Sequence, residues 1–320
     1  MNSLPSIPLK FAGIGSALPD KVVTNADLST MIDTSDEWIT ERTGIKERRV
    51  GGTTSGLAIE ASQLAIERSG IDPQTIEQVV LATTTPDKRM PGSSATIARE
   101  LGLTCGTFDL QAACAGWVYG LVVANGFLAQ GTQRLLLVGS ETMDRMVDPA
   151  DRSTAILFGN GAGAVILDSN PSAKGELLSW DLGTDGSLLH LLYTDYDNPL
   201  RMDGREVFRK AVTVVVDSSK KTMEKAGVTA ADIKLIVPHQ ANIRILESAW
   251  KRLGFSIDDT AVVLDRTGNT SAASIPIALN DAVQRGSVDD GDLVLFVGFG
   301  SGMTWGSALV RWAGQRAHAT

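Results

Sequence analysis

The strongest constraint on the fold is a pattern of helix, turn and strand that occurs twice. The segment AIERSGIDPQTIEQVVLA, which starts at Ala65, matches TMEKAGVTAADIKLIVPH, which starts at Thr222. Gly70 aligns with Gly227 at an offset of 157 residues. Two later stretches repeat in the same order, RLLLVG with LVLFVG and GNGAGAVIL with GMTWGSALV. A long unit that occurs twice indicates a duplicated α/β fold rather than a solenoid.

The two copies meet in a polar stretch, SNPSAKGE, over residues 169–176. We therefore expect one half over residues 1–172 and a second half over residues 173–320, each with a mainly β-α-β core. The segment 178–209 after this boundary is rich in glycine and aspartate. It is either an insertion that lines a ligand entrance or an ordinary surface loop.

Composition narrows the classes of function. The chain has 320 residues, 43% of them hydrophobic, which is enough for two packed units. A net charge of −8 argues against a polyanion such as nucleic acid as the partner of the whole protein. We find neither a signal-peptide pattern nor an apolar stretch near the roughly 18 residues that span a bilayer. The two cysteines favour a reducing compartment, so we expect a cytoplasmic protein.

One stretch, FDLQAACAGWVYG over residues 108–120, runs from a strand-like segment through small residues into a helix-like one. Cys114 stands at the change, between alanines and a glycine that would let a substrate approach closely. We interpret Cys114 as an exposed nucleophile on a sharp strand-to-helix turn, where the helix N-terminus stabilises a thiolate. The alternative is a small apolar cysteine in a core.

Two polar residues in the second half extend this interpretation. His239 directly follows an apolar strand, at the place that Ala82 holds in the first copy, although a lone histidine is often structural. Asn269 lies in a loop of small residues before a helix, where it could also act as a cap. Cys, His and Asn together form a nucleophilic set. The cysteine would hold an acyl group from a thioester. The other two would stabilise the enolate that a malonyl group forms on losing CO2, worth roughly 3–4 kcal/mol per donor.

The chain resembles the 3-oxoacyl-acyl-carrier-protein synthase III family of thiolase-like condensing enzymes. The resemblance covers about residues 9–312 and rests on DTSDEWITERTGI, ACAG, DPADR, FGNGAGA, VPHQANIR, GNTSAAS and GSGMTWGSALVRW. It implies an α/β, thiolase-like fold with duplicated five-layered α/β/α/β/α halves, and a homodimer. It also implies that a short acyl-CoA such as acetyl-CoA acylates Cys114. Decarboxylative condensation with malonyl-acyl carrier protein then gives 3-oxoacyl-carrier protein, CO2 and CoA. Acyl-CoA is then a substrate, and no cofactor or metal is implied.

The resemblance also assigns roles to single residues. The catalytic residues would be Cys114, His239 and Asn269. The oxyanion hole would consist of the backbone N–H groups of Cys114 and Ser301. Coenzyme A would be bound by Thr34, Trp38, Arg42, Arg152, Gly204, Phe208, Asn242 and Arg244, with Trp38 and Arg152 enclosing the adenine. The acidic carrier protein would be bound by Arg209, Arg244, Lys251 and Arg252. The acyl pocket would be lined by Met90, Trp117 and Phe299, with Met90 reaching across the dimer.

Two departures from the family pattern bear on these roles. Trp117 stands where the family usually has phenylalanine, and its bulk predicts short starters of two to four carbons unless it packs behind the site. Ser301 stands where many members have glycine, which makes a positive φ costlier. Three alternatives stay open: a related ketosynthase of secondary metabolism, an acyltransferase of the same fold, and a non-catalytic paralogue that only binds acyl chains or a partner.

Overall fold

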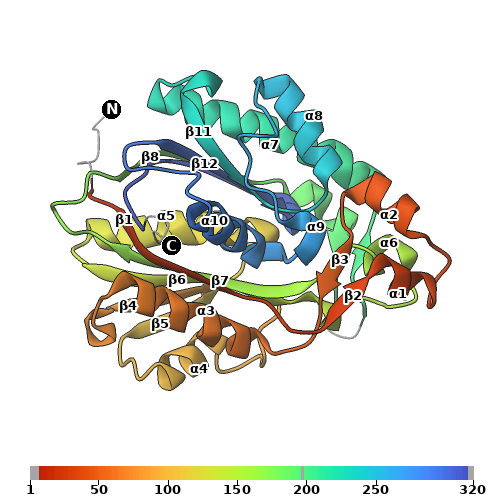
Figure 1. The fold of residues 1–320 in the computed structure, drawn as a ribbon, viewed down its shortest axis with the longest axis horizontal. Coiled ribbons are helices and arrows are strands. Elements are labelled where there is room, and N and C mark those ends of the chain that lie inside the picture. The colour runs from red at the N-terminus through yellow and green to blue at the C-terminus, as the bar shows by residue number, and fades with distance from the viewer. Residues whose placement is uncertain (1–6, 196–197, 316–320) are drawn as a thin grey trace.

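The strands form two mixed sheets, shown in Figure 1 for a computed structural model that describes residues 7–195 and 198–315. The first sheet has the order β1-β7-β6-β4-β5 and consists of β1 (Lys10–Ala17), β4 (Gln78–Ala82), β5 (Gly106–Leu110), β6 (Arg134–Thr142) and β7 (Asn160–Asp168). The second has the order β11-β12-β13-β8 and consists of β8 (Glu176–Thr184), β11 (Ile233–Pro238), β12 (Leu293–Gly300) and β13 (Thr304–Arg311). The chain leaves the first sheet for the second between β7 and β8.

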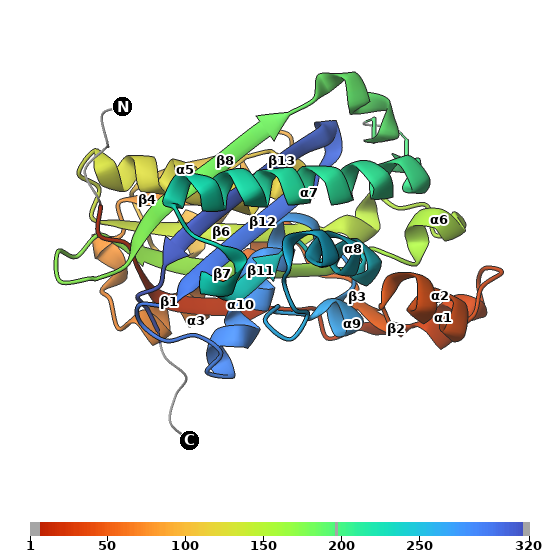
Figure 2. The same cartoon turned by 90° about the horizontal axis from the view of Figure 1, so that it is seen from above.

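Helices cover both faces of each sheet (Figures 1 and 2). The six long or central helices are α3 (Thr54–Ser69), α4 (Ser93–Glu100), α5 (Gly116–Ala129), α7 (Gly204–Ala226), α8 (Ile243–Leu253) and α10 (Ser274–Gln284). Helices α3 and α4 lie outside the first sheet, and α7 and α8 lie outside the second. Helices α5 and α10 lie between the sheets, and their apolar side chains join both sheets in one core cluster.

The prediction of an α/β, thiolase-like fold is confirmed in class, but its assignment of five layers to each half is wrong. Each half contributes one sheet, so the five layers α/β/α/β/α belong to the two halves together. An apolar face of a sheet must be covered, and the two inner faces share α5 and α10 as their cover. The ends of the predicted halves, residues 1–6 and 316–320, lie outside the described residues.

The strand pairing is duplicated, as the sequence repeat predicts. In the first sheet β4 is parallel to β6, while β6 with β7 and β7 with β1 are antiparallel. The second sheet repeats this with β11 parallel to β12, and with the antiparallel pairs β12–β13 and β13–β8. Only β5 lacks a full counterpart, because Thr260 forms just an isolated parallel bridge to Ile236. The carboxyl ends of β5 and β11 lead into the Cys114 and His239 segments.

Short elements gather at one end of the molecule in both views (Figures 1 and 2). They are β2 (Val22–Thr24), α1 (Asn25–Ser29), α2 (Asp36–Thr43), β3 (Glu47–Arg49), α6 (Arg152–Ala155) and α9 (Leu264–Thr267). Two further strands, β9 (Leu192–Tyr193) and β10 (Arg201–Met202), form a small hairpin-like pair. The N-cap of α1 is Thr24, since the Thr24 hydroxyl accepts the Asp27 N–H. None of the described helices combines the length and the apolar character that a membrane crossing requires.

Candidate active site

Cys114 lies in a sharp turn between β5 and α5. The preceding Ala113 has φ 47°, in the left-handed region that residues with a side chain rarely adopt. The end of β12 presses against this turn, since a Cβ added to Gly300 would lie 2.5 Å from the Cys114 nitrogen. The second half contains the same turn, with Ser271 at φ 49° before α10. The two turns are therefore the duplicated starts of the two central helices, and they contact each other.

The thiol of Cys114 is buried, so the prediction of an exposed nucleophile is wrong for this structure. Only 8% of the residue is accessible. Burial raises the pKa of Cys114 to about 12, because a thiolate loses its hydration there. A hydrogen bond from Ser271 acts in the opposite direction, while the charge of Glu141 adds to the rise. With a pKa of about 12, the thiol of the free enzyme is neutral at physiological pH.

His239 follows β11 directly and is also buried. Burial lowers its pKa to about 3, so the imidazole is neutral at physiological pH. Its Nδ1 lies 2.8 Å from Ser274 Oγ, and that hydroxyl lies 2.8 Å from the carbonyl oxygen of Ser271. The ring packs edge-on against Phe299. Because Nδ1 is held by Ser274, Nε2 is the nitrogen left for a substrate.

Asn269 is held in a defined orientation by its own turn. Its Oδ1 accepts the backbone N–H of Ser271 at 2.9 Å. Its backbone donates to the carbonyl of Leu157 and accepts the N–H of Gly159. With the carbonyl end of the side chain engaged, the amide NH2 is the end that can donate to a substrate.

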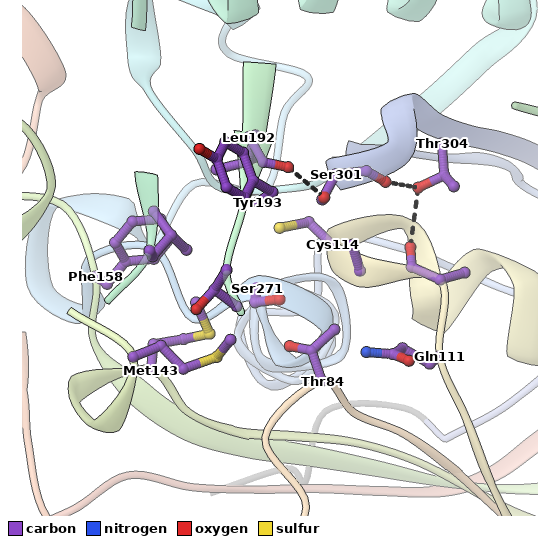
Figure 3. A pocket seen from close by; sticks show the side chains of 15 residues that line it. Thr84, Gln111, Cys114, Met143, Phe158, Leu192, Tyr193, Ser271, Ser301 and Thr304 are labelled. Carbon is purple, nitrogen blue, oxygen red and sulfur yellow. Dashed lines mark hydrogen bonds between the residues drawn. The ribbon is translucent and has the colours of Figure 1, made fainter. Parts of the chain in front are cut away.

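Two cavities meet at Cys114. The smaller one, of about 80 Å³, is lined by Cys114, His239 and Asn269 together. The larger one, of about 310 Å³, is shown in Figure 3, where the Cys114 sulfur points into it. Its wall is largely apolar and includes Met143, Met146, Phe158, Leu192 and Leu200. The structure thus brings the three predicted catalytic side chains to one cavity and places an apolar chamber beyond the sulfur.

The predicted coenzyme A residues fall into two groups. Gly204, Phe208 and Asn242 line the smaller cavity beside the catalytic side chains. Asn242 also caps α8 and donates from Nδ2 to the carbonyl oxygen of Arg42 at 3.0 Å. The guanidinium carbon of Arg244 lies 5.9 Å from the ring centre of Phe208. This first group forms a wall that leads outward from the catalytic side chains.

The second group surrounds Trp38. The guanidinium carbons of Arg42 and Arg152 each lie 4.7 Å from the centre of the Trp38 rings. This spacing leaves no room for an adenine between Trp38 and Arg152, so the predicted sandwich requires Arg152 to move away. The Thr34 hydroxyl is buried without a hydrogen-bond partner among the described residues. The structure therefore gathers these residues but does not show an open adenine site.

The structure does not bring the predicted acyl-pocket residues together. Trp117 is fully buried and packs against Phe296, with ring centres 5.1 Å apart, in the core between the sheets. Met90 is 85% exposed and lies outside the larger cavity of its own chain. Phe299 lines the smaller cavity instead. The side chain of Trp117 faces inward from α5 rather than toward the thiol, so its bulk sets no limit on starter length.

We expect the Trp117→Phe variant to keep the wild-type starter profile. The indole fills core space, and its Nε1 is buried without a partner among the described residues, so the smaller ring loses packing but removes an unpaired donor. The net change in the free energy of unfolding should stay within about 2 kcal/mol. A panel of acyl-CoA starters and a urea unfolding curve measure both quantities. A clear shift of the variant toward longer starters would indicate instead that Trp117 lines the acyl pocket.

The short turn after β12, which includes Ser301, avoids the predicted strain. Gly302, with φ 128°, takes the conformation that favours glycine, whereas Ser301 does not have a positive φ. The Ser301 hydroxyl donates to the carbonyl oxygen of Leu192 in the wall of the larger cavity. A serine is therefore accommodated here, and the role of its N–H in an oxyanion hole stays a prediction.

The residues predicted to bind the carrier protein lie on α7 and α8. Lys251 and Arg252 are exposed in the last turn of α8, where positive charge also suits the helix dipole. Arg244 is exposed in the first turn of the same helix. Arg209 on α7 is paired with Glu206 at 2.5 Å. Three of the four cations thus lie on one short helix next to the smaller cavity.

Three polar residues that hold the site together were not predicted from the sequence: Glu141, Ser271 and Ser274. Glu141 stands at the end of the apolar run RLLLVGSE, and a carboxylate at the end of such a run could have indicated a site residue. Ser271 stands two residues after Asn269, a spacing at which an asparagine side chain bonds the backbone ahead of it.

Comparisons with known proteins agree with this geometry. Two family models match, 3-oxoacyl-[acyl-carrier-protein] synthase III over residues 108–186 and its C-terminal counterpart over residues 223–312. A beta-ketoacyl-[acyl-carrier-protein] synthase III of Bacillus anthracis is 46% identical over 305 residues, covering 94% of this chain and 97% of that protein. This chain belongs to the 3-oxoacyl-[acyl-carrier-protein] synthase III family. Cys114 and Asn269 lie within the matched ranges, and so does His239.

Solved structures of the family share the fold. The synthase III of Aquifex aeolicus superposes with a TM-score of 0.93 at 40% identity, covering 95% of this chain and all of that chain. The priming beta-ketosynthase of the R1128 polyketide pathway superposes with a TM-score of 0.90 at 36% identity, covering 98% of both chains. Both solved structures share this backbone, so the fold alone does not distinguish a 3-oxoacyl-[acyl-carrier-protein] synthase III from a priming beta-ketosynthase of a polyketide pathway.

Proposed function

We propose that the chain catalyses the condensation that starts type II fatty acid synthesis. A short acyl-CoA acylates Cys114, and malonyl-acyl carrier protein then condenses with the acyl group to give 3-oxoacyl-carrier protein, CO2 and CoA. The observation that carries the proposal is the position of the Cys114 sulfur between two cavities. One cavity holds the two neutral donors, and the other is an apolar chamber for the acyl chain.

The first half-reaction is a thioester exchange. The sulfur of Cys114 attacks the carbonyl carbon of acyl-CoA, the carbon–sulfur bond to CoA breaks, and the thiol proton ends on the departing CoA sulfur. The neutral His239, which lines the same cavity, is the base that relays this proton. A neutral thiol and a neutral imidazole avoid a buried ion pair in the free enzyme, which would be costly to desolvate.

The second half-reaction uses the same cavity in a different way. Loss of CO2 from the malonyl thioester leaves an electron pair that is shared with the thioester oxygen as an enolate. The Asn269 NH2 donates to that oxygen, and so does His239 in its Nε2–H tautomer, in which the Ser274 hydroxyl turns from the Ser271 carbonyl to Nδ1. The enolate carbon then attacks the acyl carbon on Cys114, the bond from that carbon to sulfur breaks, and the released Cys114 thiolate takes up a proton from solvent. Fixed donors in a dry cavity stabilise such charge strongly because they need no reorganisation. The chain's own side chains supply these steps, and acyl-CoA enters as a substrate.

The test of the proposal is a product assay with acetyl-CoA and malonyl-acyl carrier protein. We expect 3-oxobutanoyl-carrier protein, identified by its mass. Transfer of the acetyl group to another acceptor without loss of CO2 would indicate an acyltransferase instead. Failure of acetyl-CoA to label Cys114 would indicate a binding protein. A panel of starters and carrier proteins separates primary from secondary metabolism.

The cationic end of α8 provides a prediction for carrier recognition. The double charge reversal Lys251→Glu and Arg252→Glu should raise the KM for malonyl-carrier protein about tenfold and leave the KM for acetyl-CoA unchanged. The difference from wild type should shrink as salt rises, because ions screen the wild-type attraction. Steady-state kinetics at two salt concentrations measure this. The double charge reversal Lys220→Glu and Lys221→Glu, at two exposed positions of α7, is the charge-matched control. Equal losses for both substrates would assign the α8 cations to coenzyme A or to structure.

We also propose that the enzyme is a cytoplasmic homodimer. Strand β5 lies at the edge of the first sheet, and its free edge is a template for pairing with a second copy. The exposed Met90 belongs to the loop that precedes α4, next to this edge. Both cysteines are free, as is usual in a reducing compartment. Sedimentation at micromolar concentration tests the dimer.

A further inference from the structure

A buried carboxylate lies beneath the two catalytic turns. Glu141, near the end of β6, is 0% accessible. Its oxygens accept two backbone N–H groups and four hydroxyl groups, from Thr83, Thr84, Thr85 and Ser271. A buried carboxylate is retained only with such a full set of donors. The first three donors belong to the first half, whereas Ser271 belongs to the second half.

Ser271 connects Glu141 with every catalytic side chain. Its backbone N–H donates to Asn269 Oδ1 at 2.9 Å, and its hydroxyl donates to Glu141 Oε1 at 3.0 Å. Its carbonyl accepts the hydroxyl of Ser274, which contacts His239 Nδ1. Ser271 is also one of two non-glycine residues with a positive φ in the described structure. A residue in this conformation is held there by its surroundings, which here include the bond from its side chain to Glu141 across the halves.

We propose that Glu141 is a positioning residue for the condensation step, acting through Ser271 to keep the Asn269 amide in its donating orientation. The inference rests on the proposed function, because it takes Asn269 as an enolate donor. Glu141 lines neither cavity at Cys114, so it touches no substrate and acts only through its neighbours. By tying the second-half turn to the strands of the first half, it fixes Asn269 relative to Cys114.

The Glu141→Gln variant tests this link selectively. The backbone N–H groups of Thr84 and Thr85 both donate to Oε2, so the amide oxygen of glutamine should stay on that side. Its NH2 group then faces Ser271, whose hydroxyl loses its acceptor and can only accept a weaker, uncharged hydrogen bond from the amide. We expect the single-turnover rate of condensation to fall about tenfold or more, with the KM for malonyl-carrier protein unchanged.

Acylation of Cys114 should respond differently. The carboxylate charge opposes formation of the thiolate, so its removal should leave the acylation rate within about threefold of wild type or raise it. General damage to the site would slow both steps together. The ratio of the two rates therefore separates a positioning role from a merely structural one.

Two further variants complete the design. Ser271→Ala removes the hydroxyl and keeps the backbone, and Ala113 shows that alanine is accommodated at this φ. If Glu141 acts through that hydroxyl, the double variant should condense no more slowly than the slower single variant. Thr83→Val is the matched control, because it removes a donor to the same carboxylate without touching Ser271. It should condense within about threefold of wild type.

The outcomes are distinct. Normal condensation by Glu141→Gln, equal slowing of both steps, or additive losses in the double variant would each overturn the inference. If Glu141→Gln does not fold, Ser271→Ala alone must still slow condensation more than acylation for the inference to stand. Normal condensation by Asn269→Ala would instead overturn the role of Asn269 in the proposed function.

Discussion

Replacing Cys114 by serine should remove acylation by acyl-CoA, lowering kcat by about 10³-fold or more. The thiol of Cys114 is already costly to ionise, with a pKa raised to about 12 by burial. A hydroxyl in the same place is a far weaker nucleophile, and the neutral His239 is too weak a base to activate it. Intact-protein mass spectrometry after mixing with acetyl-CoA measures the loss directly.

The chain offers its own control for this variant. Cys105, the other free cysteine, is partly buried directly before β5 and lines neither cavity at Cys114. Cys105→Ser should acylate at the wild-type rate and keep the mass increase of one acetyl group. A persistent acetyl adduct on Cys114→Ser, or its loss from Cys105→Ser, would assign the nucleophile elsewhere.

Replacing Asn269 or His239 by alanine should mainly remove condensation. Each substitution deletes one donor to the enolate oxygen, which should lower the condensation rate by about 10²–10³-fold. Asn269→Ala should acylate near the wild-type rate, because its side chain takes no part in the thioester exchange. His239→Ala should acylate more slowly as well, because it loses the base. Single-turnover assays of the two half-reactions, each with its own substrate, separate these effects.

A conservative variant sharpens this prediction. Asn269→Asp keeps the acceptor for the Ser271 N–H but replaces the donating NH2 by a carboxylate oxygen. It should lose condensation at least as fully as Asn269→Ala, because a negative charge would then face the enolate. Condensation at the wild-type rate by either variant would rule out Asn269 as a donor.

The repeated pattern was sufficient to predict the fold class. Matching glycines at helix ends, such as Gly70 and Gly227, and matching apolar strands fix the order of elements in each half, and the sheets pair in the same order. The pattern could not show how the layers are shared, because a repeat describes each half alone. The two inner faces of the sheets share α5 and α10 because residues far apart in the sequence pack together.

The catalytic side chains could be named from the sequence because each interrupts an apolar or small-residue run at a strand end or a turn. The environment of these side chains could not be predicted from the sequence. The burial of Cys114 depends on Gly300 and Ser271, which reach it from the other half. Trp117 lies three residues after Cys114, about one helical turn away. Only the structure shows that its side of α5 faces the core. Glu141 was missed because its partners come from two segments far apart in the sequence, residues 83–85 and Ser271.

The most direct test of the central claim is a two-step mass measurement on the wild-type chain. After mixing with acetyl-CoA, the protein should gain the mass of one acetyl group, located on Cys114 by peptide mapping. After malonyl-carrier protein is added, that mass should disappear from the enzyme, and 3-oxobutanoyl-carrier protein should appear with release of CO2. An acetyl group that never forms on Cys114, or one that malonyl-carrier protein does not consume, would contradict the proposed function.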